Sequence, residues 1–313
     1  MSEVSSQIKP IINAIIFGDA LYRIPNKNID TVLAESNARA INLDWGSPSS
    51  FALATLDAFS ENNRTFDLMK SMSKIEDGKF TPENKSTLTD SPIEKQAIDK
   101  YRKNLLTPSK TAAKNTLNSN SFLTRMIIVS ANATKLYGAD FISNSKAMDE
   151  IHKAVALTHN NPSAMVAGGF ISVLVSQLIT NADSNMTIDN SLSLIYEYYS
   201  SRKTFQSELN KLSALNLPGF KDTKKENLIT DMNCFHTIEN AIWAVDRAKN
   251  IQEALKNGLK LKEKNSVTMS ITTVYAMCHF NKQEYINRKA NYFKNSDEIE
   301  VIARVAEKSR KFI

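Results

Sequence analysis

Apolar side chains recur at helical spacing through most of the 313-residue chain. In the first such segment, residues 8–21, the side chains of Ile11, Ile12 and Ile15 share one broad stripe, because residues three and four apart lie on the same face of a helix. The same spacing predicts further helices over residues 51–59, 92–107, 122–136, 148–157, 164–178, 191–200, 203–212, 234–248, 251–259, 268–278, 283–293 and 298–311. We find no convincing strand pattern, so the chain is predicted to be all-α.

The helix that starts at residue 92 carries the clearest start signal. Ser91 is a good N-cap by type, Pro92 suits the first turn, and Glu94 completes a capping box with Ser91. The helix is expected to end near Thr107, because the residue before a proline disfavours the helical conformation.

Glycine and proline number only eight each. All-β domains need many tight turns and usually take them from these two residues, so their scarcity supports long helices. Two polar stretches, 71–90 and 215–227, are predicted to be loops or inserted segments. We therefore predict one large domain over residues 1–313, with surface insertions near 71–115 and 215–227.

The charge pattern and the cysteines exclude several function classes. The net charge is +6, and the basic residues are scattered rather than gathered into a stripe with base-reading partners. This argues against nucleic-acid binding. Cys234 and Cys278 lie in apolar helical segments, and no Cys/His cluster has zinc-ligand spacing. We expect buried reduced thiols and no zinc site.

One uncharged stretch, residues 162–180, approaches the ~20 apolar residues that cross a membrane. It contains Gly168, Ser172 and Gln177, so we predict a buried core helix and no membrane span. The N-terminus lacks the basic start and cleavage site of a signal peptide, which favours the cytoplasm. The Lys-, Asn- and Ile-rich composition and the charged C-terminal tail also fit a bacterial protein that is secreted into a host or rival cell.

Five short motifs follow one another along the chain, each beside a predicted helix. Their order and spacing resemble the motifs of the ADP-ribosylglycohydrolase family over about residues 11–280. The resemblance implies the family's fold, a single large orthogonal helical domain, and a function in ADP-ribose recognition. The motifs are Gly18-Asp19-Ala20-Leu21, Ser47-Pro48-Ser49-Ser50, Ser119-Asn120-Ser121 with Arg125, Thr158-His159, and Glu263-Lys264-Asn265-Ser266-Val267-Thr268.

Three of these motifs depart from the family pattern: in the third, Ser119 and Ser121 stand where the family has glycine, and the second and fifth lack the family's aspartates. Members of the family typically hydrolyse ADP-ribose linkages with two Mg²⁺ ions held by aspartates. The matching positions here are Pro48, Ser49, Asn265 and Val267. Neutral or absent side-chain oxygens do not balance two dications. We therefore expect no metal cofactor, unless a carboxylate outside the family pattern substitutes. Asp19, Asp44 and Glu263 are the candidates for that role or for a general base.

Ligand binding can survive the loss of the metals. The resemblance implies that ADP-ribose, free or attached to a protein, would lie beside the turn 119–121 and the Thr-His pair. The candidate ligand-binding residues are Ser119, Asn120, Ser121, Thr158 and His159. Backbone N–H groups at such a helix start can hold a diphosphate.

Each candidate also has a structural interpretation. Asp19 can cap a helix, His159 can begin a helix with its ring in solvent, and Arg125 can be an ion-pair partner. His236 lies on an apolar helical segment and is predicted to be a core histidine. The residues best suited to helix capping are Ser47, Ser50 and Thr268.

Three functions fit this sequence. The first is a pseudoenzyme that keeps an ADP-ribose-type cleft without the binuclear Mg²⁺ site. The second is an active but divergent ADP-ribosyl-protein hydrolase. The third sets the resemblance aside and takes the chain as a helical effector or immunity protein that binds a protein partner.

Overall fold

The computed structural model describes residues 7–34, 42–61, 65–104, 118–180, 186–261 and 265–309. These ranges are helical and contain no strand; two isolated bridges link Leu43 with Phe293 and Ser119 with Asn233. The all-α prediction is therefore confirmed. The α-helices are α1 (Ile8–Arg23), α2 (Ile29–Leu33), α3 (Ser47–Glu61), α4 (Thr65–Ser73), α5 (Pro92–Asn104), α6 (Leu123–Tyr137), α7 (Ser145–Ala156), α8 (Pro162–Thr180), α9 (Thr187–Ser200), α10 (Lys203–Gln206), α11 (Cys234–Asp246), α12 (Ile251–Leu259), α13 (Ser266–His279), α14 (Gln283–Ala290) and α15 (Ser296–Lys308).

Most predicted helices are present, and the differences fall on short elements. The sequence pattern missed α2 and α4, which are too short to show several turns of an apolar stripe. The predicted helix over 203–212 is interrupted: α10 ends at Gln206 and a 3-10 helix follows over Leu209–Asn216. Within the predicted loop 71–90, α4 ends and the 3-10 helices Lys74–Asp77 and Leu88–Asp90 follow.

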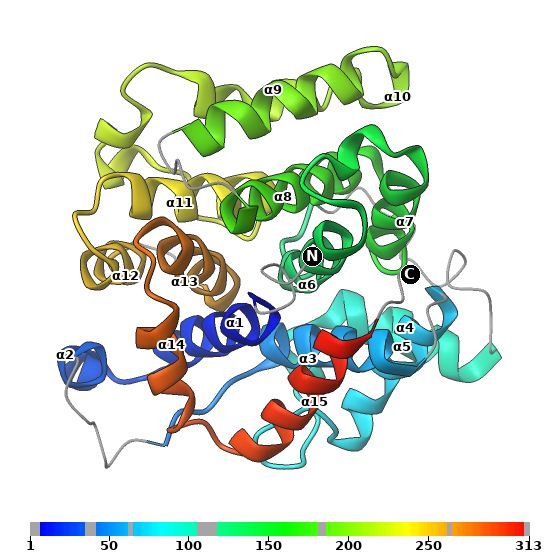
Figure 1. Ribbon diagram of the computed structural model, residues 1–313, viewed down its shortest axis with the longest axis vertical. Coiled ribbons are helices and arrows are strands. Elements are labelled where there is room, and N and C mark those ends of the chain that lie inside the picture. The colour runs from blue at the N-terminus through cyan, green and yellow to red at the C-terminus, as the bar shows by residue number, and fades with distance from the viewer. Residues whose placement is uncertain are drawn as a thin grey trace.

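Helices α1 and α13 pack side by side at the centre of the fold (Figure 1). Their contact depends on Gly18, because a Cβ there would lie 2.4 Å from the Met269 carbonyl oxygen. Helix α3 packs on α1, and α11 and α12 pack on α13. The close approach of α1 and α13 therefore brings the end of one helix near the start of the other.

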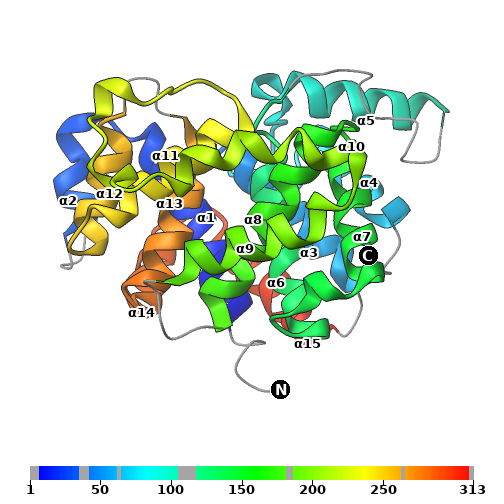
Figure 2. The same cartoon turned by 90° about the horizontal axis from the view of Figure 1, so that it is seen from above.

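Helix α8 forms a second centre, between α6 and α9 (Figures 1 and 2). It is long and apolar enough to cross a membrane, but most of it is buried inside the fold. The Tyr199 hydroxyl of α9 lies so near Gly169 that a Cβ there would approach it to 2.3 Å. This close packing confirms the prediction of a core helix.

The start of α5 is at the predicted residue, but the predicted capping box is wrong. The Ser91 carbonyl accepts from the Lys95 N–H, as at a helix start, while the Ser91 N–H is donated to Leu88. The Ser91 hydroxyl is donated to Ser47, and Glu94 accepts the hydroxyl of Ser121. Both side chains turn inward because polar partners at the start of α3 and just before α6 are available there.

Candidate functional site

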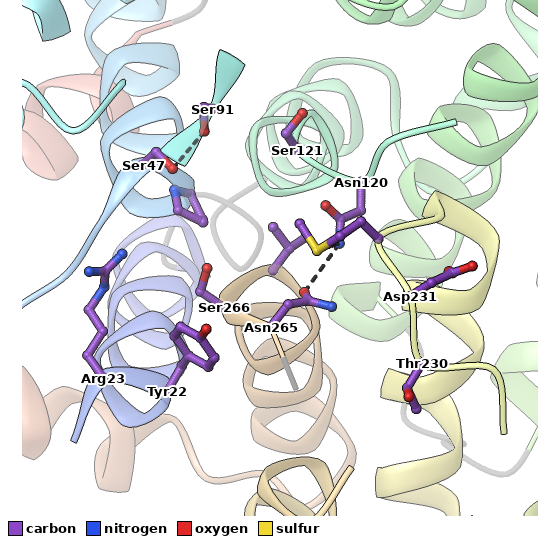
Figure 3. Close-up of a pocket in the computed structure, with 13 residues that line it drawn as sticks. Tyr22, Arg23, Ser47, Ser91, Asn120, Ser121, Thr230, Asp231, Asn265 and Ser266 are labelled. Carbon is purple, nitrogen blue, oxygen red and sulfur yellow. Dashed lines mark hydrogen bonds between the residues drawn. The ribbon is translucent and has the colours of Figure 1, made fainter. Parts of the chain in front are cut away.

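A cavity of about 250 Å³ lies where several helices begin (Figure 3). The end of α1, the starts of α3 and α13, the residues preceding α5 and α6, and the segment before α11 all reach it. Serine and asparagine side chains dominate its polar surface. Its lining residues are Tyr22, Arg23, Ser47, Pro48, Ser91, Asn120, Ser121, Thr230, Asp231, Met232, Asn265, Ser266 and Val267.

Capping side chains fix these helix starts. Asn265 caps α13, with its Oδ1 accepting the Thr268 N–H at 2.8 Å, so Thr268 is capped rather than the cap. Asn233 caps α11 by accepting the Phe235 N–H. At α3 the acceptor comes from another helix, because Asp19 accepts the N–H groups of Gly46 and Ser49. The helix starts thus converge with several of their N–H groups already bonded.

Ser47 and Ser50 do not supply the cap of α3. Ser50 donates its hydroxyl to the Gly46 carbonyl, and Ser47 accepts the hydroxyl of Ser91 at 2.8 Å. The capping interpretation of Asp19 is the one that the hydrogen bonds bear out. Asp19 is fully buried, accepts the Ser49 hydroxyl at 2.7 Å, and pairs with Arg23 at 3.2 Å.

The candidate catalytic carboxylates do not gather at the cavity. Asp19 is fully buried and is not among the residues that line the cavity. The Asp44 side chain is 44% exposed and lies 3.4 Å from Lys294, away from the lining residues. Glu263 lies outside the described residues. Among the described lining residues Asp231 is the only carboxylate, and its half-exposed side chain pairs with His236 at 2.8 Å.

The residues present do not fit a binuclear Mg²⁺ site. Mg²⁺ takes oxygen ligands in near-octahedral geometry and needs carboxylates to offset its charge. Pro48 and Val267 offer no side-chain oxygen, and the Asn265 oxygen already accepts from Thr268 and from Asn120. Within the described ranges, no three His, Cys, Asp or Glu side chains are placed to hold a metal ion.

The turn 119–121 contributes two residues to the cavity. Asn120 and Ser121 line it, while the Ser119 hydroxyl lies 3.0 Å from that of Ser121. The Asn120 amide nitrogen donates to Thr237 at 2.9 Å and to Asn265 at 3.2 Å. Asn120 is fully buried, and its Oδ1 has no hydrogen-bond partner among the described residues.

Thr158 and His159 lie buried behind this turn rather than on the cavity surface. Thr158 accepts from Arg125 at 2.6 Å and bonds His159 Nδ1 at 2.7 Å. The His159 ring packs on Phe122, with centroids 4.8 Å apart, so it is not the solvent-exposed ring of the structural interpretation. Burial, together with the Arg125 charge, lowers the pKa of His159 to about 3, which keeps the ring neutral.

Glu94 is a residue of this region that sequence reasoning took for a capping residue. Its Oε1 accepts the Ser121 hydroxyl at 2.5 Å and lies 3.9 Å from His159 Nδ1. Burial raises the pKa of Glu94, and the positive charge of Arg125 opposes that shift. The capping-box spacing concealed Glu94, because the same side chain can turn toward its own helix start or toward a neighbouring helix.

Arg125 and His236 also have definite places. Arg125 was predicted to be an ion-pair partner, but it is fully buried and donates to the carbonyl oxygens of Ala154 and Val155, so the bonds that the structure gives it are to neutral acceptors. Burial lowers its pKa to about 10. His236 was predicted to be a core histidine, but its side chain is 26% exposed and pairs with Asp231 beside the cavity.

Comparison with known proteins agrees with this architecture. A family model described as ADP-ribosylglycohydrolase matches residues 17–272. The chain is also similar to a solved structure described as an ADP-ribosylglycohydrolase-related protein complex, with a TM-score of 0.66 and 13% sequence identity. That alignment covers 99% of this chain and 100% of the other. Sequence identity this low shows the shared fold alone. Among curated proteins, no relative matches.

Proposed function

Because this chain belongs to the ADP-ribosylglycohydrolase family, we propose that it binds an ADP-ribose-type ligand without the family's two-metal hydrolysis. One observation carries this proposal: the side chains at the metal-motif positions are neutral, and the two polar ones are already bonded within the protein. Asn265 accepts from Asn120 and from the start of α13, and Ser49 donates its hydroxyl to Asp19. The cavity has lost the charge that metals require but has kept a polar lining.

The size of the cavity limits how much of the ligand it holds. Pockets for drug-sized ligands enclose about 300–1,000 Å³. The cavity of about 250 Å³ falls below that range, so it suits one sugar unit rather than a whole ADP-ribose. The rest of the ligand, or the modified protein that carries it, would extend past the exposed Met232 at the rim.

Calorimetric titration of the protein with ADP-ribose, with and without Mg²⁺, tests the proposal. We expect binding with the same affinity in both conditions, because the described lining offers no carboxylate pair for the metal. Binding that strengthens with Mg²⁺ would show that a carboxylate outside the family positions holds a metal. No binding in either condition would leave the fold without its ligand and refute the proposal.

A variant that restores the acidic motifs provides the matched control. Replacing Pro48, Ser49, Asn265 and Val267 together by aspartate returns carboxylates to the two helix starts. We expect Mg²⁺ to stabilise this variant and not the wild type, by about 2.7 kcal/mol at a Mg²⁺ concentration of 100 times the dissociation constant. Thermal unfolding with and without Mg²⁺ measures the difference.

The rival function is an active, divergent hydrolase. Asp19 is committed to Arg23 and to the start of α3, and Asp44 lies off the cavity, so Glu263 would be its remaining candidate base. Mg²⁺-stimulated release of ADP-ribose from a modified protein, lost in Glu263→Ala, would favour the rival over our proposal. A role as an effector or immunity protein, and its place in the cytoplasm or in another cell, stay predictions.

A further inference from the structure

The last described helix, α15, carries an apolar stripe on its outer face. Its inner face is buried against α1 and α3 through Ile299, Ala303 and Ala306. Val301 and Val305 lie on the opposite side, and they are 48% and 44% exposed. Residues four apart share one face of a helix, so the two valines form one continuous apolar stripe. Figure 1 shows α15 in front of α3, at the face of the molecule turned to the viewer.

Exposed charges of opposite sign lie at the two ends of this stripe. Glu298 lies three residues before Val301, and Lys308 lies three residues after Val305. Each end has a second charge of the same sign, so the acidic residues are Asp297 and Glu298 and the basic residues are Arg304 and Lys308. Among the described residues, none of these four side chains has an ion-pair partner. The stripe is therefore acidic at its start and basic at its end, and these charges are open to a partner.

A groove of about 610 Å³ runs along one side of the stripe. Val301 and Ile302 line it, together with the ring of Phe80. Two charged residues of its wall, Asp57 and Lys74, lie 2.9 Å apart and offset each other's charge. The groove therefore offers apolar surface, and room beside the stripe for the side chains of a neighbouring helix.

An antiparallel second copy of α15 complements this surface. A two-fold axis at the level of residue 303 places Val301 against the partner's Val305 and Glu298 against the partner's Lys308. Both pairs are centred on the same residue, so one axis satisfies them together, as an interface between identical chains requires. The same arrangement places the positive end of each helix dipole near the negative end of the other.

We propose that the outer face of α15 is the contact surface of a homodimer in which the two helices pack antiparallel. The valines form the apolar centre, and the pairs between Glu298 and Lys308 set the direction. Interfaces below ~1,200 Å² are typical of weak and transient pairs, so we expect a reversible dimer that forms as the concentration rises. The groove and the cavity at the helix starts have no lining residue in common, so this inference does not rest on the proposed function.

Sedimentation velocity of the full chain over a range of concentrations tests the dimer. The sedimentation coefficient of the wild type should rise from the monomer value toward the dimer value. The double variant Val301→Asp, Val305→Asp should stay at the monomer value, because it places carboxylates at the centre of the contact. The matched control is Leu217→Asp, which changes a 63% exposed leucine elsewhere and should leave the association unchanged. A wild type that stays monomeric, or a double variant that still forms the dimer, would overturn the proposal.

Charge exchange tests the direction of the two helices. Glu298→Lys alone and Lys308→Glu alone each create two like-charge pairs across the axis, which should weaken self-association more than about tenfold. In an equal mixture of these two variants, one chain carries two lysines at these positions and the other carries two glutamates. Every pair across the axis is then of opposite sign, so the mixture should form a heterodimer at least as tightly as the wild type forms its homodimer.

The mixture also separates loss of contact from loss of fold. Both side chains are exposed, so thermal unfolding of each single variant should match that of the wild type. Recovery of the dimer on mixing requires two folded chains. A mixture that stays monomeric, or single variants that associate like the wild type, would contradict the antiparallel arrangement.

Discussion

The two sides of the cavity differ in what their polar atoms are bonded to. On the α13 side, the Asn265 side-chain oxygen accepts hydrogen bonds from the Thr268 N–H of its own helix and from the Asn120 amide. On the α6 side, Asn120 keeps an oxygen with no partner among the described residues, and the buried Glu94 and Arg125 side chains lie behind it. The Asn265 oxygen on the first side is therefore used for hydrogen bonds within the protein. The second side still holds groups that are costly to bury, which is typical of a site that meets a ligand.

This contrast shows that a helix cap does not require a charged residue. An aspartate and an asparagine both accept a backbone N–H at the N-cap, so the replacement at residue 265 preserves the cap while it removes the charge. The helix start is therefore preserved although residue 265 carries no charge. The buried Arg125 and Glu94 side chains behind α6 do not cap a helix, and replacing Arg125 provides the largest test of the comparison.

Replacing Arg125 by methionine should cost the most stability. The change removes the donor to Ala154 and Thr158 and leaves Glu94 buried without its nearby positive charge. Each buried polar group that loses its hydrogen-bond donor costs about 1–3 kcal/mol. Urea unfolding gives the free energy. The matched control is Arg102→Met, whose arginine is 36% exposed and pairs with Glu76, and which should cost about 0–1 kcal/mol. Equal costs would mean that the α6 side is no different from the surface.

The sequence predicted the helical class and most helix positions, because long apolar stripes record the 3.6-residue period directly. The resemblance to the family's motifs also singled out Asn120 and Ser121, which line the cavity. The sequence pattern did not predict α2 or the break after Gln206, where elements shorter than two or three turns depend on tertiary contacts.

The remaining errors concern side chains that serve a distant element. Asp19 caps α3 from α1, and Glu94 of α5 bonds Ser121 before α6. Local spacing cannot reveal such bonds, because the two partners are 30 and 27 residues apart. His236 was taken for a core residue because its helix is apolar, although its partner Asp231 precedes that helix by only a few residues.

The pH dependence of stability should report the next largest effect. The folded pKa of His159 is about 3, against an ordinary value of 6.5. A lowered folded pKa gives stability that is complete above pH 6.5 and is lost as pH falls toward 3. The loss is about 1.4 kcal/mol for each pH unit in that window. Glu94 acts with the opposite sign, because its raised folded pKa makes stability fall as pH rises above 4.5.

The variant His159→Gln isolates the His159 contribution, because Glu94 and the other titrating groups are common to both proteins. Urea unfolding at pH 4.5, 5.5 and 6.5 should show a steeper loss in the wild type than in the variant. Three groups lie next to the His159 ring: the Thr158 hydroxyl, which also accepts from Arg125, the Glu94 carboxyl of α5, and the Phe122 ring just before α6. Identical slopes would show that His159 titrates as it does in solution and is not part of a buried network.

The smallest change in stability is expected for Asn265 on the α13 side. It tests whether Asn265 only caps its helix or also orients Asn120. Asn265→Ala removes the cap of α13 and should cost about 0.5–2 kcal/mol, while Asn265→Asp keeps the acceptor and should cost less, because a carboxylate is favourable at a helix start. If residue 265 only caps its helix, the two variants differ in stability and bind ADP-ribose alike. If it also orients Asn120, Asn265→Ala frees that amide to turn its nitrogen toward the cavity, and the affinity for ADP-ribose falls with stability. Asn265→Asp still accepts from Asn120 and should keep the affinity. We therefore expect Asn265→Ala to lose both stability and affinity for ADP-ribose, and Asn265→Asp to keep both. That result would show that one oxygen atom, Asn265 Oδ1, both caps α13 and orients the Asn120 amide.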